Sequence, residues 1–201
     1  AFAGLKTTVV SGLDSVQFGA LTTAQIQALT TAQAAALTDT QALGVTTSQV
    51  GSLESRDLLL MSATAFAALG TSVVSNLNSL QMSALTTEQV AALTTAQAAV
   101  LTTTQAVGMN SAQVGALETR DLVKLMTGSV QAIRTTALAG LSDAQLSALN
   151  TAQVVALNTA QAAVLTAVQA VGVNTAQAQM LETSDLNKLT TAAFAALGTS
   201  V

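Results

Sequence analysis

The chain has 201 residues, of which 50% are hydrophobic, 2% are aromatic and 8% are charged, against about 25% charged in a typical soluble domain. It contains no Cys and no His, which excludes disulfides, thiolate and imidazole metal ligands and the commonest general base. The net charge of −4 provides no basic surface for phosphates, so we do not expect nucleic-acid binding.

The first residues, AFAGLKTTVV, do not show a basic region followed by an apolar run and a cleavage site, so they do not predict a signal peptide. The mean hydropathy of +0.55 is high for a soluble chain. However, no run of about 18 apolar residues occurs without Thr, Gln or Asn. The sequence therefore predicts no membrane insertion.

From Leu5 onward the sequence divides without insertions into units of eight residues, which we call octads and which include LDSVQFGA, LTTAQIQA and LTTAQAAA in succession. Position 1 is apolar in all 25 octads, position 6 is apolar wherever it is present, and position 5 is Gln in 15 octads. Such regularity indicates a repeated three-dimensional environment, as in a solenoid.

Each octad carries the signals of one short helix. In the octad that begins at Leu21, Thr22 or Thr23 is a candidate N-cap, and Gln25 is placed to close a capping box. The equivalent residues of the next octad are Thr30, Thr31 and Gln33.

The apolar positions of an octad fit one face of such a helix. Position 6 and the following position 1, for example Ile26 and Leu29, are three residues apart and so point inward together. Gly at position 8, for example Gly44, is typical of a helix end in a left-handed conformation. These patterns predict an all-α solenoid with one short helix per octad, stabilised by stacking because such helices are unstable alone. The even period leaves a β-solenoid as the alternative.

The octad LESRDLLL is chemically distinct because it contains Glu54, Arg56 and Asp57. Two carboxylates could contribute to a calcium site, which is the one cofactor considered, but an adjacent Arg already neutralises part of their charge. The alternative is a helix start with local ion pairs that fixes the register or the contact between adjacent coils. Two related octads follow, and their candidate residues are Glu118, Arg120, Asp121, Glu182 and Asp185.

The sequence also repeats with a longer period, which consists of eight octads. The super-repeats cover about residues 5–68, 69–132 and 133–196, and a partial repeat follows, so we expect a single repeat domain over 1–201. Four or eight octads per coil would both divide this period. Neither end resembles the polar cap that solenoids need, so we expect a segment of a longer array.

The Thr and Gln positions allow two interpretations each. Regular ranks of Thr are expected of an ice-binding or glycan-binding face, but the same hydroxyls are used up if they cap helices. The Gln side chains can hydrogen-bond along the stack, or they can close the capping boxes of their own helices. Both alternatives stay open at this point.

The units LTTAQIQALTTAQAAALT, LTTEQVAALTTAQAAVLT and LNTAQVVALNTAQAAVLT resemble the Ala/Thr/Gln-rich repeats of very large bacterial surface proteins of the adhesin or filament type. The resemblance implies export to the cell surface or outside the cell, an extended array and a role in attachment or assembly. It implies no binding residue. The Gly- and Asp-rich calcium-binding nonapeptides of some such proteins do not occur in this sequence.

The sequence offers no nucleophile beside a base and no paired carboxylates in a cleft, so we expect no enzyme activity. The leading hypothesis is a structural spacer or a self-associating fibre, whose partner is another copy of the chain bound end to end or laterally. The alternative is a binding module that presents its Thr ranks to ice or to cell-surface glycans. A designed repeat protein is a further alternative.

Overall fold

The computed structural model describes residues 2–197, and in this range it contains short helices and no strand. The prediction of an all-α solenoid is therefore confirmed, and the β-solenoid alternative is wrong. The physical reason lies in the dominant residues: Ala, Leu and Gln favour helices, whereas strands favour β-branched and aromatic side chains.

The chain divides between Val100 and Leu101 into two compact units, which are described separately. Unit 1 begins with a 3-10 turn and continues with twelve helices: η1 (Phe2–Gly4), α1 (Thr7–Ser11), α2 (Ser15–Gly19), α3 (Thr23–Gln27), α4 (Thr31–Ala35), α5 (Asp39–Ala42), α6 (Thr47–Val50), α7 (Ser55–Leu58), α8 (Ala63–Ala67), α9 (Thr71–Val74), α10 (Ser79–Ala84), α11 (Thr87–Ala91) and α12 (Thr95–Ala99). The described part of unit 2 contains α13 (Thr103–Gly108), α14 (Ser111–Ala116), α15 (Thr119–Leu122), α16 (Thr127–Ala132), α17 (Thr135–Leu138), α18 (Asp143–Ala148), α19 (Thr151–Val155), α20 (Thr159–Ala163), α21 (Ala167–Val171), α22 (Thr175–Met180), α23 (Thr183–Leu186) and α24 (Thr191–Ala196).

Every octad from α1 to α24 repeats one backbone pattern. The helix starts at position 3, and the residue at position 2 is the extended N-cap, as Thr22 is with φ −71° and ψ 158°. After four to six helical residues the chain turns, and position 1 of the next octad, for example Leu29, begins the link to the next helix. The octad is therefore one helix plus one link.

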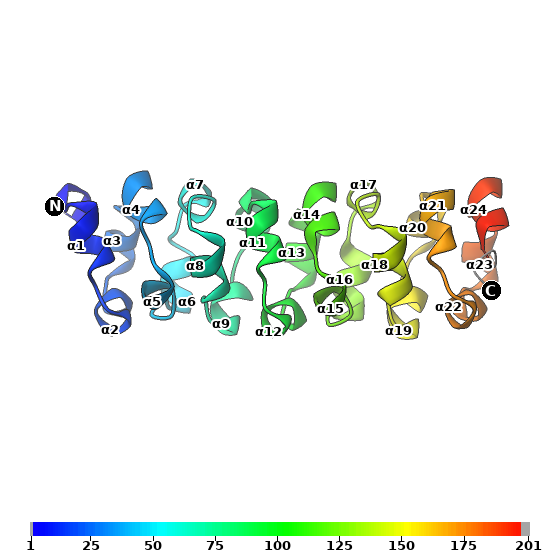
Figure 1. Ribbon diagram of the computed structural model, residues 1–201, viewed down its shortest axis with the longest axis horizontal. Coiled ribbons are helices and arrows are strands. Elements are labelled where there is room, and N and C mark those ends of the chain that lie inside the picture. The colour runs from blue at the N-terminus through cyan, green and yellow to red at the C-terminus, as the bar shows by residue number, and fades with distance from the viewer. Residues whose placement is uncertain (1, 198–201) are drawn as a thin grey trace. The chain divides into compact units, whose positions relative to one another are not determined.

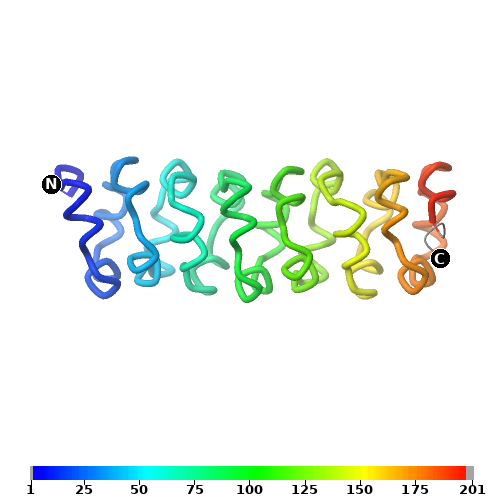
Figure 2. The backbone as a smooth tube through the Cα atoms, in the orientation of Figure 1, coloured from blue at the N-terminus to red at the C-terminus, as the bar shows by residue number. Residues whose placement is uncertain are grey.

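Three helices complete one coil of the solenoid. In unit 1 each helix packs on the third helix after it, so that α1, α4, α7 and α10 form one column, and the same rule holds within unit 2 for α13, α16, α19 and α22. Figure 1 shows these columns within each unit, and the tube in Figure 2 shows the successive turns of the chain. The sequence left the number of octads per coil open, and the structure has neither of the two numbers, four and eight, that would divide the longer period. Because a coil is three octads, the longer period of eight octads does not contain a whole number of coils.

The core of each unit is built from positions 1 and 6, as the sequence predicts. Ile26 and Leu29 are 1% and 2% exposed, and Phe66 and Leu69 occupy the same positions in a later coil of unit 1 and are also buried. In unit 2, Leu146 and Leu149 repeat this arrangement. Stacking of coils therefore removes the apolar residues of each octad from water, which stabilises helices too short to form alone.

Glycine at position 8 serves close backbone approach instead of a left-handed turn. None of the glycines described in detail has a positive φ angle, so the expected left-handed helix end at Gly44 is wrong. A Cβ atom at Gly44 would lie 2.0 Å from the carbonyl oxygen of Ser15, which belongs to the preceding coil. In unit 2, Gly140 approaches the carbonyl of Ser111 in the same manner. Glycine at these places sets how closely α5 can pack on α2 and α17 on α14.

Candidate functional site

The glutamine at position 5 satisfies the N-terminus of its own helix. In α11 the Oε1 atom of Gln89 accepts a hydrogen bond from the backbone N–H of Thr86 at 3.0 Å. The Thr86 hydroxyl oxygen in turn accepts a hydrogen bond from the backbone N–H of Gln89 at 3.2 Å. Two of the N–H groups that a helix start leaves unpaired are thus satisfied by one capping box.

The other end of the same amide reaches the preceding coil. The Nε2 atom of Gln89 donates to the carbonyl oxygens of Leu58 at 2.7 Å and Met61 at 2.8 Å. Leu58 ends α7, and Met61 lies in the link to α8. One buried side chain therefore joins the start of one helix to the end of another, and both sequence alternatives for Gln hold together.

We call the residues that make this second contact the bridging glutamines. Their Nε2 atoms donate to the carbonyl 28 residues earlier, 31 residues earlier or both, and in some cases to the carbonyl 30 residues earlier. In unit 1 they are Gln33, Gln41, Gln49, Gln81, Gln89 and Gln97. In unit 2 they are Gln145, Gln153, Gln161, Gln169 and Gln177.

The predicted capping residues near the N-terminus lie at two such helix starts. Thr22 is the N-cap of α3, its hydroxyl oxygen accepts from the backbone N–H of Gln25 at 3.2 Å, and Thr23 is the exposed first helical residue. Of the two candidates, the structure thus assigns the cap to position 2. In α4 the cap is Thr30, Thr31 is exposed, and Gln33 donates from Nε2 to the carbonyl of Leu5 at 2.8 Å.

Capping boxes follow a pattern of five helices with them and three without. In unit 1 the helices α2 to α6 carry them, α7 to α9 do not, and α10 to α12 carry them again. In unit 2 the helices α15 to α17 interrupt two such runs. Five plus three octads make the eight-octad period, and three octads make one coil. Once in each period, therefore, one coil lacks capping boxes.

The coil α7 to α9 has no amide at position 5. Its residues there are Asp57, Ala65 and Val73, all of which are buried. None of these three side chains carries the N–H group that a bridging glutamine donates to the preceding coil. The junction between the coil α4 to α6 and the coil α7 to α9 is therefore held mainly by apolar packing.

The three candidate residues of the first charged octad lie at this junction. Glu54 is the N-cap residue of α7 but makes no side-chain cap, and its Oε2 atom lies 2.7 Å from Nε of Arg56. Asp57 is 1% exposed, and its Oδ1 atom lies 3.9 Å from Nε of Arg56. Neither carboxyl oxygen of Asp57 has a hydrogen-bond partner within the described chain. Burial raises the pKa of Asp57, the charge of Arg56 opposes this effect, and the charge of Glu54 adds to it.

The two equivalent octads of unit 2 share part of this arrangement. Glu118 pairs with Arg120 at 2.7 Å, and Asp121 is buried at position 5. In the third octad Asp185 is 7% exposed, while Glu182 accepts from the hydroxyl of Ser184 at 3.4 Å because no Arg follows it. The charged octads thus combine an exposed local pair or hydrogen bond with a buried carboxylate.

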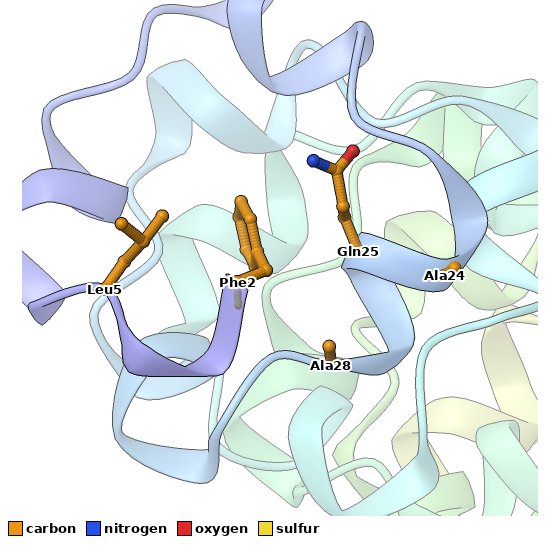
Figure 3. Close-up of a pocket in the computed structure, with 5 residues that line it drawn as sticks. All are labelled: Phe2, Leu5, Ala24, Gln25 and Ala28. Carbon is orange, nitrogen blue, oxygen red and sulfur yellow. The ribbon is translucent and has the colours of Figure 1, made fainter.

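A pocket of about 450 Å³ lies beside α3, and it is lined by Phe2, Leu5, Ala24, Gln25 and Ala28. Figure 3 shows the Phe2 side chain between those of Leu5 and Gln25. None of the five lining residues is ionisable or nucleophilic. The pocket therefore provides shape and an apolar lining but no group for catalysis or metal binding.

The described residues offer no built metal centre. Within residues 2–197 no three or more His, Cys, Asp or Glu side chains are placed to hold a metal ion. In the same part of the chain no helix has the length and apolar character that crossing a bilayer requires.

Comparison with known proteins identifies the repeat. Residues 2–31, 114–150 and 122–159 match a family model described as the ALTTAQ repeat. The predicted LTTAQ-type repeat is thereby confirmed. No curated protein matches the chain significantly. The matched repeats, together with the repetitive helical fold, indicate a structural repeat segment.

Sequence reasoning missed the geometry between coils. The bridging contacts join residues 28 to 31 positions apart, a spacing that no local motif encodes. The sequence does contain a signal for the coil α7 to α9, which lacks bridging glutamines. Position 5 is not Gln in three successive octads, where the residues are Asp57, Ala65 and Val73.

Proposed function

We propose that this chain is a non-enzymatic segment of a bacterial surface protein and acts as a spacer whose length is set by the number of coils. The observation that carries the proposal is the one-way hydrogen bonding of the bridging glutamines. In unit 2, Gln153 donates to Leu122 and Leu125 of the preceding coil, and Gln177 of the next coil donates backwards in the same way. An octad with a bridging glutamine both caps its own helix and contacts the previous coil. Further coils of the same kind can therefore be added to the array.

A change in the number of super-repeats tests the spacer function. We expect that duplicating residues 69–132 lengthens the particle in small-angle X-ray scattering in proportion to the added chain, with unchanged helical content per residue. A matched control duplicates residues 69–116, which are six octads or two whole coils, and is expected to lengthen the particle proportionally less. A particle that becomes wider but not longer would contradict the proposal.

We propose that the segment also associates with other copies of itself, end to end or laterally, at the cell surface or outside the cell. The support is that one packing geometry repeats from coil to coil. A head-to-tail contact between two such copies that does not close into a ring leaves a free surface to which a further copy can bind. Sedimentation velocity over a hundredfold range of concentration tests this part. A strictly monomeric particle at the highest concentration would contradict self-association and leave the spacer function standing.

One observation favours a second function, binding to a glycan or to ice. In unit 2 the column α13, α16, α19 and α22 carries a Thr at the same place of each helix, and all four side chains are exposed. These residues are Thr103, Thr127, Thr151 and Thr175. Binding to a glycan array, or thermal hysteresis, that is lost when all four are changed to Ala would support this function. The matched control changes four other exposed threonines of unit 2 to Ala, which lie on α15, α17, α23 and α24 and so outside that column: Thr119, Thr136, Thr183 and Thr191.

A further inference from the structure

The buried carboxyl group of Asp57 takes the place of a bridging amide. In the octads that carry a bridging glutamine, the amide nitrogen donates to the carbonyl 28 or 31 residues earlier or to both, as Gln81 does to Leu53 and Val50. The same spacing from Asp57 leads to Leu29, which begins the octad of α4, and to Ile26 in the last turn of α3. An ionised carboxylate only accepts hydrogen bonds, so it cannot replace the donated N–H groups. A protonated carboxyl group has one O–H to donate.

The helices that pack against Asp57 bring no compensating charge. Helix α7 packs on α4 and α10, and neither the sequence TAQAA of α4 nor the sequence SLQMSA of α10 contains an ionisable side chain. The ionisable neighbours on its own octad are Glu54 and Arg56, and the 2.7 Å contact commits Arg56 to Glu54. Arg56 is also well exposed, so water screens its effect on Asp57.

We propose that Asp57 is a proton-binding site that makes the junction between the coil α4 to α6 and the coil α7 to α9 dependent on pH. With a proton bound, the carboxyl group is neutral and can donate its O–H to a carbonyl of the preceding coil. After ionisation, a buried charge without a donor partner faces that coil, and the junction loosens. The inference rests on this coil junction alone and holds whether or not the array is a spacer.

The sign of the pH dependence follows from burial. Because the folded state raises the pKa of Asp57 above that of the unfolded chain, the folded state holds the proton more tightly. The corresponding stability is fully present below the unfolded pKa and is lost as pH rises through the folded pKa. The junction is therefore more stable in acid than at neutral pH. A carboxylate that forms an ion pair would show the opposite pH dependence, because its contribution to stability is lost as pH falls.

Two measurements on the whole chain test the proposal. The first follows the 13C chemical shift of the Asp57 side-chain carboxyl with pH, and we expect its midpoint clearly above the ordinary range of an aspartate. The second compares urea unfolding of the wild type and Asp57→Asn from pH 3 to pH 8. The ratio of their unfolding constants should change about tenfold for each pH unit that separates the folded and unfolded pKa values of Asp57.

Asp39→Asn, which removes an exposed carboxyl group, is the matched control, and the carboxyl group of Asp57 should titrate in it as it does in the wild type. If Asp57→Asn does not fold, Asp57→Gln replaces it, and the carboxyl titration of the wild type decides independently. An Asp57 midpoint within the ordinary range of an aspartate would overturn the proposal. So would a rise in stability on adding CaCl2 at pH 7 that Asp57→Asn abolishes, because the site would then bind a cation in place of the proton.

Discussion

Gln89 and Leu58 lie 31 residues apart in the sequence, yet the Nε2 atom of Gln89 donates to the carbonyl oxygen of Leu58 at 2.7 Å. The same side chain also caps α11 through Thr86. Local helix formation and long-range stacking thus depend on one amide. Residues that combine both functions should be far less tolerant of substitution than glutamines that make neither contact.

We expect Gln89→Ala to lower the free energy of unfolding by about 2 to 4 kcal/mol, because it removes the partner of the buried Met61 carbonyl and of the Thr86 backbone N–H. The measurement is urea unfolding monitored by circular dichroism. Gln27→Ala is the matched control, because Gln27 is exposed, and it should change stability by less than about 0.5 kcal/mol. Equal effects of the two substitutions would show that the bridging contacts contribute little.

Two glycines of unit 1 should respond to Ala in opposite directions. Gly44→Ala places a Cβ 2.0 Å from the carbonyl oxygen of Ser15 and should destabilise the chain by roughly 1 to 3 kcal/mol. Gly51 has helical backbone angles, and a Cβ atom added there would have no atom within 4 Å. Gly51→Ala should therefore stabilise the chain by about 0.4 to 1 kcal/mol. Thermal unfolding of the two variants checks the pair, and destabilisation of the same size in both would contradict it.

The N-cap at position 2 can be separated from its neighbour at position 3. The Thr30 hydroxyl oxygen accepts from the backbone N–H of Gln33 at 3.3 Å, so Thr30→Ala should cost about 0.5 to 2 kcal/mol. Thr31 is the exposed first residue of α4, and Thr31→Ala should be nearly neutral. Helical content and urea midpoints measure the difference. A larger loss for Thr31→Ala would place the cap at position 3.

Glu88 should show a pH dependence opposite to that of Asp57. Hydrogen bonds from its own backbone N–H and from Thr86 lower the pKa of Glu88, which lies in the first turn of α11. Its contribution is therefore present above the unfolded pKa and is lost as pH falls through the folded pKa. Glu88→Gln should reduce stability at pH 7 and leave it unchanged at pH 3. A reduction of equal size at both pH values would exclude this electrostatic contribution.

The sequence was sufficient to predict the features that depend on neighbouring residues. The eight-residue period, the short helix and the inward direction of Ile26 and Leu29 all follow from spacing within one octad. The sequence could not decide between Thr22 and Thr23 as the cap, because Thr is a suitable N-cap residue at either position. Only the backbone angles distinguish them, with Thr22 extended and Thr23 helical.

The number of octads per coil could not be predicted, because it depends on the angle that each link makes with its helices. That angle is set by contacts between successive coils, such as the contact of Gly44 with Ser15, which are distant in the sequence. The eight-octad period suggested a whole number of coils, but it instead counts five octads with Gln and three without. The buried position of Asp57 was missed for the same reason, since its neighbours come from the coil before.

The most direct test of the three-octad coil is a nuclear Overhauser measurement on the side-chain amide protons of Gln89. The structure predicts cross-peaks from these protons to the backbone protons near Leu58 and Met61. A coil of four octads would bring the amide one octad further back along the chain, near Val50 and Leu53. Cross-peaks to Val50 and Leu53, without those to Leu58 and Met61, would contradict the account.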